Sequence, residues 1–147
     1  MTTLHNILQA NSAKQYATNA GTRTHNTLRH IIIDSAHPQG DTELIKRINS
    51  TPGLASFFCR NAKTEVPIAG TINNRFISRR IDRMIIDHTN KTIKILDYKT
   101  DTTKTAFYTQ YVAQINEYTQ LLRAIHPTYR INGYILWTHD FSLEKIV

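Results

Sequence analysis

Apolar residues at the start of the chain recur at helical spacing. They lie at Leu4, Ile7 and Leu8, and again at Leu28, Ile31 and Ile32. Asp41 suits the N-cap of a short helix ending near Asn49, because its carboxylate can accept a hydrogen bond from the first turn. Thr51-Pro52 suits the start of another helix, since proline is tolerated there. Residues 1–61 are therefore predicted to be helices and loops.

The next part of the chain changes to strand-like patterns. Residues 63–71 contain Pro67, which suits an edge strand because proline cannot donate a hydrogen bond to a neighbour. Residues 75–87 are apolar on both faces, which predicts a strand covered on both sides. A turn at 87–90 then leads to a third strand at 91–99. Simple alternation divides the second strand into two sets, with Ile77, Ile81 and Ile85 on one face and Phe76, Met84 and Ile86 on the other.

The last third of the chain returns to helical spacing and then to one more strand. Residues 106–125 place a series of apolar side chains on one helix face, namely Phe107, Tyr111, Ile115, Tyr118, Leu122 and Ile125. Residues 130–138 place four residues on one side of a strand, namely Ile131, Gly133, Ile135 and Trp137. This order predicts an α/β fold with a mixed central sheet flanked by helices. No repeat or composition change divides it, so 1–147 is predicted to be one domain, with a helical part at about 1–61 and an α/β core at about 62–147.

Charge and composition narrow the possible functions. Lys and Arg number 18 and Asp and Glu 11, so the net charge is +7, which favours an anionic partner such as nucleic acid. No apolar run is long enough for a transmembrane helix, and the N-terminus carries no secretory signal, so we expect a cytoplasmic protein. The single cysteine, Cys59, excludes an internal disulfide and a four-cysteine zinc or iron–sulfur site.

The third predicted strand carries the most informative chemistry. Asp97 and Lys99 are two residues apart, so they share one strand face at about 7 Å. A carboxylate can hold a hard cation, and a nearby amine can orient a water or stabilise negative charge at phosphorus. Asp82 on the preceding strand could meet Asp97 at one cation. The alternatives are that Asp97 and Lys99 form a surface ion pair and that Asp82 pairs with Arg80 or Arg83.

Two other positions could contribute to the same site. Gln114 and Tyr118 are four residues apart on the predicted long helix, so they lie one turn apart on one face and can hydrogen-bond to phosphate. Alternatively, Tyr118 belongs to the core and Gln114 is its polar flank. His25 lies early in a predicted helix and could supply a nitrogen ligand, or it is an ordinary surface histidine.

These residues occur in a recognisable order. Gly-x-x-x-His at 21–25 is followed by Glu-Val-Pro-Ile at 65–68, Arg-Ile-Asp-Arg at 80–83, Leu-Asp-Tyr-Lys-Thr-Asp at 96–101 and Gln-x-x-x-Tyr at 114–118. The series resembles the RecB-type branch of the PD-(D/E)XK nucleases, and within it the C-terminal nuclease domain of AddA-type bacterial helicase–nucleases. The resemblance spans His25 to about Trp137. It implies a restriction-endonuclease-like core.

The resemblance also implies roles for individual residues. It implies that the metal ligands are His25, Asp82, Asp97 and the main-chain carbonyl of Tyr98, with Mg²⁺ as the cofactor and Mn²⁺ as a substitute. It implies that Lys99 is the catalytic lysine, acting with Asp82 and Asp97. Gln114 and Tyr118 would contact DNA and support the site.

The residues around the second motif are less regular. Arg79 stands where the family often has a glycine, and Arg79 and Arg80 are expected to contact DNA phosphates. Glu65 matches a common acidic position on the first strand, but we expect no direct catalytic role because Pro67 marks an edge. The cysteines that hold an iron–sulfur cluster in some relatives are absent, so no such cluster is expected.

The resemblance implies a metal-dependent DNA exonuclease or endonuclease that prefers single strands and serves double-strand break repair or recombination. The implied partners are DNA, a helicase portion and an AddB-like subunit. No Gly-x-x-x-x-Gly-Lys-[Ser/Thr] occurs, so no ATP site is expected in this chain. Two alternatives stay open: a catalytically silent DNA-binding or partner-docking module, and a free-standing restriction-like endonuclease.

Overall fold

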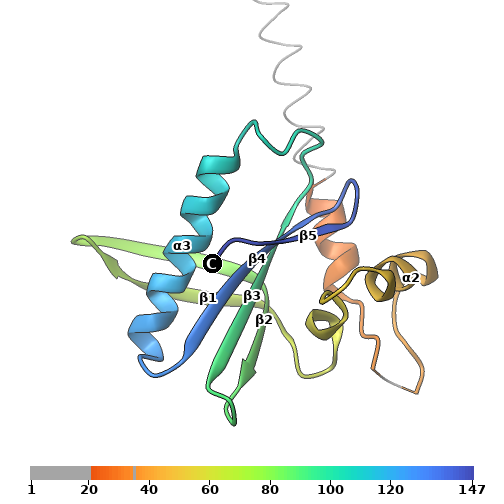
Figure 1. The fold of residues 1–147 in the computed structure, drawn as a ribbon, viewed down its shortest axis with the longest axis horizontal. Coiled ribbons are helices and arrows are strands. Elements are labelled where there is room, and N and C mark those ends of the chain that lie inside the picture. Colours follow the sequence, from red (N-terminus) through yellow and green to blue (C-terminus); the bar gives the residue numbers. More distant parts are fainter. Residues whose placement is uncertain (1–20, 35) are drawn as a thin grey trace, which may run out of the picture.

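The computed structural model describes residues 21–34 and 36–147, which form an α/β fold (Figure 1). Its elements, after a helical segment at 21–29, are α2 (Thr42–Ser50), the 3₁₀ helix η1 (Ala55–Phe58), β1 (Lys63–Ile72), β2 (Arg75–Asp87), β3 (Thr92–Lys99), α3 (Tyr108–Ile125), β4 (Arg130–Trp137) and β5 (Ser142–Lys145). The predicted strands and the long helix are confirmed, each within two residues of its expected bounds. In the described part of the chain, no helix is long and apolar enough to cross a membrane.

The five strands form one mixed sheet in the order β1-β2-β3-β4-β5. β1, β2 and β3 are antiparallel neighbours, β4 is parallel to β3, and β5 is antiparallel to β4. Helix α3 connects the parallel pair β3 and β4, as a crossover connection must. β1 lies at the edge of the sheet, so the prediction from Pro67 is confirmed.

Each face of the sheet has its own hydrophobic core. The core under α3 includes Ile95, Ile115, Tyr118 and Trp137. The core on the opposite face includes Leu28, Leu96 and residues of α2 and η1. Figure 1 shows α3 on one side of the sheet and the helical segments of the N-terminal part on the other. Both cores meet β3, which therefore carries its functional residues between two packed layers.

Strand β2 departs from the simple alternation expected of it. Ile81 packs into the core under α3, but Met84 packs there too and Ile85 packs against the opposite core, so the predicted division of faces is wrong. Glu65 and Asp82 are not paired, although the residues on both sides of them in β1 and β2 are. Glu65 also has a φ of 52°. A backbone irregularity of this kind shifts the side-chain alternation by one residue. Asp82 therefore lies where β2 changes faces.

The N-terminal part is less helical than its spacing suggests. The helical segment ends at residue 29, and Ile32 instead forms an isolated bridge with Gln39. Thr51-Pro52 begins a turn that leads into η1 and not an α-helix. The prediction for Asp41 is confirmed, since its side chain accepts a hydrogen bond from the N–H of Leu44 at 3.0 Å. The expected helix around Leu4, Ile7 and Leu8 lies outside the described residues.

Candidate active site at the ends of β2 and β3

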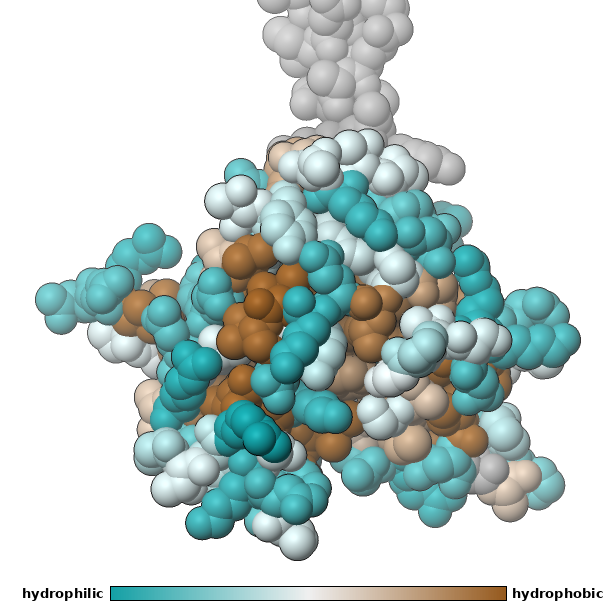
Figure 2. All heavy atoms as spheres, viewed as in Figure 1, coloured by the Kyte–Doolittle hydropathy of each residue, from teal (hydrophilic) through white to brown (hydrophobic). Residues whose placement is uncertain are grey.

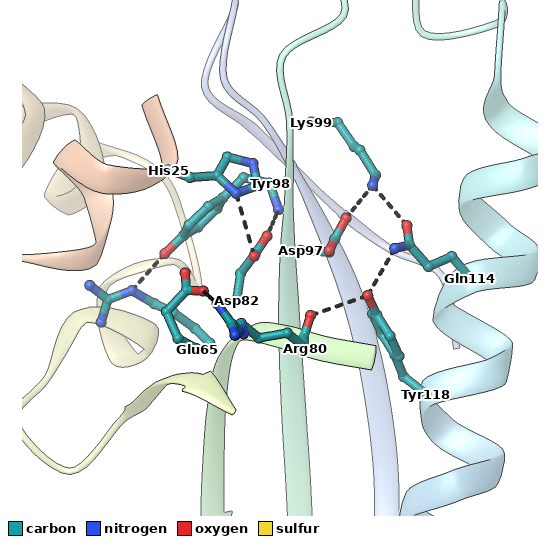
Figure 3. A network of polar contacts seen from close by, with 10 residues as sticks. His25, Glu65, Arg80, Asp82, Asp97, Tyr98, Lys99, Gln114 and Tyr118 are labelled. Atoms are coloured by element: carbon teal, nitrogen blue, oxygen red, sulfur yellow. Dashed lines mark hydrogen bonds and ion pairs between the residues drawn. The ribbon is translucent and has the colours of Figure 1, made fainter. Parts of the chain in front are cut away.

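Two carboxylates come together where β2 and β3 stop pairing. The paired register ends at Arg83 and Leu96, and the next step in that register would place Asp82 opposite Asp97. Both side chains are buried. The carboxylate of Asp82 accepts a hydrogen bond at 2.8 Å from the backbone N–H of Tyr98, the residue after Asp97 (Figure 3). The expected approach of the two carboxylates from adjacent strands is therefore present.

Burial and neighbouring charges raise the pKa values of Asp82 and Tyr118. Burial, and next the negative charge of Asp97, raise the pKa of Asp82 to about 8, although the N–H of Tyr98 and the charge of Lys99 act in the opposite direction. Burial and then the charges of Asp97 and Asp82 also raise the pKa of Tyr118. The site therefore disfavours the charged form of Asp82, which a bound cation would favour.

A chain of polar contacts connects Asp97 to helix α3 (Figure 3). The ammonium of Lys99 lies 2.6 Å from Oδ2 of Asp97 and donates a hydrogen bond to Oε1 of Gln114 at 2.8 Å. The amide of Gln114 donates to the hydroxyl of Tyr118 at 2.8 Å, and that hydroxyl donates to the backbone carbonyl of Arg80 at 3.3 Å. These contacts confirm that Asp97 and Lys99 share a face, and that Gln114 and Tyr118 lie one turn apart on the helix face that meets them. Tyr118 is also buried in the core under α3, so the alternative that it is a core residue is confirmed and its expected contact with DNA is not supported.

The pair formed by Asp97 and Lys99 is buried and is not the surface ion pair considered as an alternative. Their side chains are only 6% and 14% exposed. The ammonium also lies 4.3 Å from the ring centroid of Tyr111, whose hydroxyl donates to the carboxylate of Asp101. Oδ2 of Asp97 is itself buried, and the ammonium of Lys99 is the charged partner beside it.

His25 reaches the site from the opposite side. Its Nδ1 lies 3.5 Å from Oδ1 of Asp82, and its ring packs edge-on against the ring of Tyr98, with centroids 5.2 Å apart. Among residues 21–34 and 36–147, no three side chains of His, Cys, Asp or Glu are grouped as a metal site. Two of the expected ligands, His25 and Asp82, contact each other instead. The third, Asp97, contacts the expected catalytic residue Lys99.

These residues nevertheless suit a divalent cation. Two buried carboxylates and an imidazole are the oxygen and nitrogen ligands that Mg²⁺ and Mn²⁺ accept. The raised pKa of Asp82 shows that its charge lacks full compensation. Asp82, Asp97 and His25 would hold the ion. The role of the Tyr98 carbonyl stays a prediction.

Arg83 is a structural residue that the sequence reasoning missed. Its guanidinium is buried and donates to the hydroxyl of Tyr98 at 2.7 Å and to the backbone carbonyls of Phe57 at 2.9 Å, Leu28 at 2.6 Å and Ile31 at 3.1 Å. It therefore fixes the end of the helical segment that carries His25 to the strand that carries Asp97. The available signal was an arginine directly before the apolar run Met84-Ile85-Ile86.

Arg79 and Arg80 of β2 form ion pairs away from Asp82. Arg79 lies 3.1 Å from Glu117, and Arg80 lies 3.6 Å from Glu65. Together with the contacts of Arg83, these pairs leave the alternative of an Asp82–arginine ion pair without support among the described residues. Contact of Arg79 and Arg80 with DNA stays a prediction.

The chain matches no protein-family model and no curated protein sequence. The family resemblance therefore rests on the sequence motifs alone.

Proposed function

We propose that the protein is a divalent-metal-dependent deoxyribonuclease that hydrolyses phosphodiester bonds. The proposal is carried by one observation: Asp82 and Asp97, from adjacent strands, lie beside a lysine that is oriented by Gln114. Nucleases of several kinds combine paired carboxylates, a divalent cation and an amine in this way. The net charge of +7 suits a polyanionic substrate.

The residues of the site have separable roles in this proposal. A divalent cation held by Asp82 and Asp97, with His25 alongside, would polarise the scissile phosphate and lower the pKa of the attacking water. Lys99 keeps its ammonium group at the same place through Asp97 and Gln114. That ammonium stabilises the negative charge that develops on the phosphate oxygens, and it does so strongly because the site is poorly solvated.

The motif resemblance extends the proposal to a particular setting. It supports a restriction-endonuclease-like core within the observed α/β fold, Mg²⁺ as the working ion with Mn²⁺ as a substitute, and single-stranded DNA as the preferred substrate. It further supports a role in double-strand break repair or recombination, with a helicase portion and an AddB-like subunit as partners.

A labelled single-stranded oligonucleotide tests the proposal directly. Wild-type protein should release shorter products with Mg²⁺ or Mn²⁺ and none with EDTA. Asp97→Asn and Lys99→Ala should abolish this cleavage. Lys94→Ala is the matched control, because Lys94 is exposed on the same strand and takes no part in the site. Cleavage that survives both site substitutions would refute the assignment.

A catalytically silent DNA-binding module is the second candidate. The pairing of Lys99 with Asp97, and the absence of a grouped ligand set in the described part of the chain, favour it. DNA binding without metal-dependent cleavage in the same experiment would select this alternative.

A further inference from the structure

The hairpin formed by β1 and β2 projects away from the body of the fold. Figure 1 shows it extending past helix α3 as a two-stranded arm. We call residues 68–80 the arm. Asn73 and Asn74, with φ values of 51° and 62°, make its turn between the paired residues Ile72 and Arg75. Two consecutive residues with positive φ give a tight two-residue hairpin turn, so the end of the arm has a defined conformation.

Phe76 lies near the end of the arm with its side chain in solvent. It is 73% exposed, whereas its neighbour Ile77 is 6% exposed and packs into the core under α3. Strand alternation therefore places Phe76 on the face turned away from α3, together with Ser78 and Arg80. An aromatic ring at such a position contributes nothing to the core, which makes it available to a ligand.

The charge of the arm indicates what that ligand is. The arm contains Arg75, Arg79 and Arg80 and no acidic residue. Arg75 forms no ion pair with any described residue, and the side chain of Arg80 is 68% exposed despite its contact with Glu65. The projecting end of the arm is largely hydrophilic on its visible side (Figure 2). Arg80 shares the strand face of Phe76, whereas Arg75 and Arg79 alternate onto the face toward α3. An exposed aromatic ring on the same face as an exposed arginine is complementary to a nucleic acid, which offers both base faces and phosphates.

The arm is continuous with the strand that carries part of the candidate active site. Phe76 and Asp82 are six residues apart on β2, which is about 20 Å of extended strand. Phe76 lies on the face turned away from α3, whereas Lys99 and Asp97 lie on the face toward α3. A base on Phe76 would therefore bind at a distance from the carboxylates.

We propose that the arm binds single-stranded DNA, with a base stacked on Phe76 and a phosphate beside it held by Arg80. The inference rests on the proposed function in taking DNA as the substrate, but it concerns binding and can be tested without cleavage.

The test is the affinity for a fluorescent oligothymidine, measured by anisotropy in EDTA so that no cleavage occurs. Phe76→Ala should weaken binding by roughly 5- to 100-fold, the usual range for removing a stacked aromatic ring. Phe76→Trp should retain the affinity and Phe76→Leu should not, because stacking needs a planar ring. Ile125→Ala is the matched control, since Ile125 is 55% exposed at the end of α3 and should leave binding unchanged.

Two results would overturn the inference: Phe76→Ala that binds like the wild type, or Phe76→Leu that retains full affinity. Failure of wild-type protein to bind the oligonucleotide would overturn it as well. Loss of binding in Phe76→Ala, combined with no metal-dependent cleavage by the wild type, would refute the nuclease proposal and leave the arm as a DNA-binding element. Metal-dependent cleavage by the wild type, combined with unchanged DNA binding by Phe76→Ala, would support the nuclease proposal and refute the role of the arm.

Discussion

The backbone N–H of Tyr98 donates a hydrogen bond at 2.8 Å to the carboxylate of Asp82, across the point where β2 and β3 stop pairing. The main chain of one strand thus holds a carboxylate of the other. This contact keeps Asp82 buried beside Asp97, a position that raises its pKa to about 8. The geometry that brings the carboxylates together is therefore costly for the protein unless a proton or a cation is present.

Removal of the Asp82 charge should change how stability depends on pH. The pKa of this carboxyl rises from 3.8 to about 8 on folding, so its neutral form favours the folded state. That contribution is complete below about pH 4 and is lost as the pH rises toward 8, with a slope of at most about 1.4 kcal/mol per pH unit. Thermal melts in EDTA between these limits should show this loss for the wild type and not for Asp82→Asn.

The same melts include their own control. Asp87→Asn removes a carboxylate at the last residue of β2, where hydrogen bonds from Asn90 lower the pKa, so it should not remove the loss of stability toward pH 8. Mg²⁺ should restore much of the stability that the wild type loses at high pH, because the ion binds the charged form. Wild type and Asp82→Asn that respond to pH in parallel would disprove the electrostatic interpretation.

Gln114 should act as a positioning residue for the ammonium of Lys99. Gln114→Leu removes the acceptor at 2.8 Å and leaves Lys99 with Asp97 alone. A hydrogen bond to a charged group contributes about 1.5–3 kcal/mol, so kcat should fall roughly 10- to 100-fold while KM changes little. Tyr118→Phe is the comparison, because it removes only the hydroxyl at the far end of the network. A purely structural role would lower the melting temperature without this selective loss of kcat.

Arg83 should be essential for stability although it lies outside the chemistry. Arg83→Met would leave the carbonyls of Leu28, Ile31 and Phe57 without their buried donor, which should lower the free energy of unfolding by about 3 kcal/mol or more. Arg80→Met, at an exposed position on the same strand, should stay within about 0.5 kcal/mol of the wild type. Denaturant titration of the two variants compares them, and equal stability would contradict the role assigned to Arg83.

Much of the fold could be predicted because its signals are local. The shared face of Asp97 and Lys99 follows from the two-residue period of a strand, and the contact between Gln114 and Tyr118 follows from the helical period. Both pairs required only that each element be identified correctly. The Asp41 cap is equally local, since it depends on the residues that directly follow it.

The features that were not predicted correctly from the sequence depend on residues that lie far away along the chain. Arg83 contacts the carbonyl of Leu28, which lies 55 residues earlier in the chain. The change of face at Asp82 depends on an irregularity opposite it at Glu65 on another strand. β5 is short and has little apolar character, so its pairing with β4 defines it, and it was not predicted.

The close packing of α3 on β4 can be tested at Gly133. A Cβ atom there would lie 2.3 Å from Cγ2 of Ile115, far below a normal contact. Gly133→Ala should therefore lower the free energy of unfolding by about 1–3 kcal/mol, as overpacking usually does. In an Ile115→Ala background the same substitution should cost less, because the clashing methyl group is gone. Additive effects in denaturant titrations of the four proteins would contradict this packing.

Substrate preference distinguishes the proposed nuclease from a restriction-like enzyme. The proposed preference for single-stranded DNA predicts that single strands and frayed ends are cut faster than a blunt duplex of the same sequence. Rates should fall steeply as salt rises, since contacts between arginines and phosphates release counterions. Labelled oligonucleotides of both kinds, compared with Mg²⁺ or Mn²⁺ at low and high salt, measure both effects. Faster cleavage inside the blunt duplex, with fixed fragment lengths, would instead favour the restriction-like alternative.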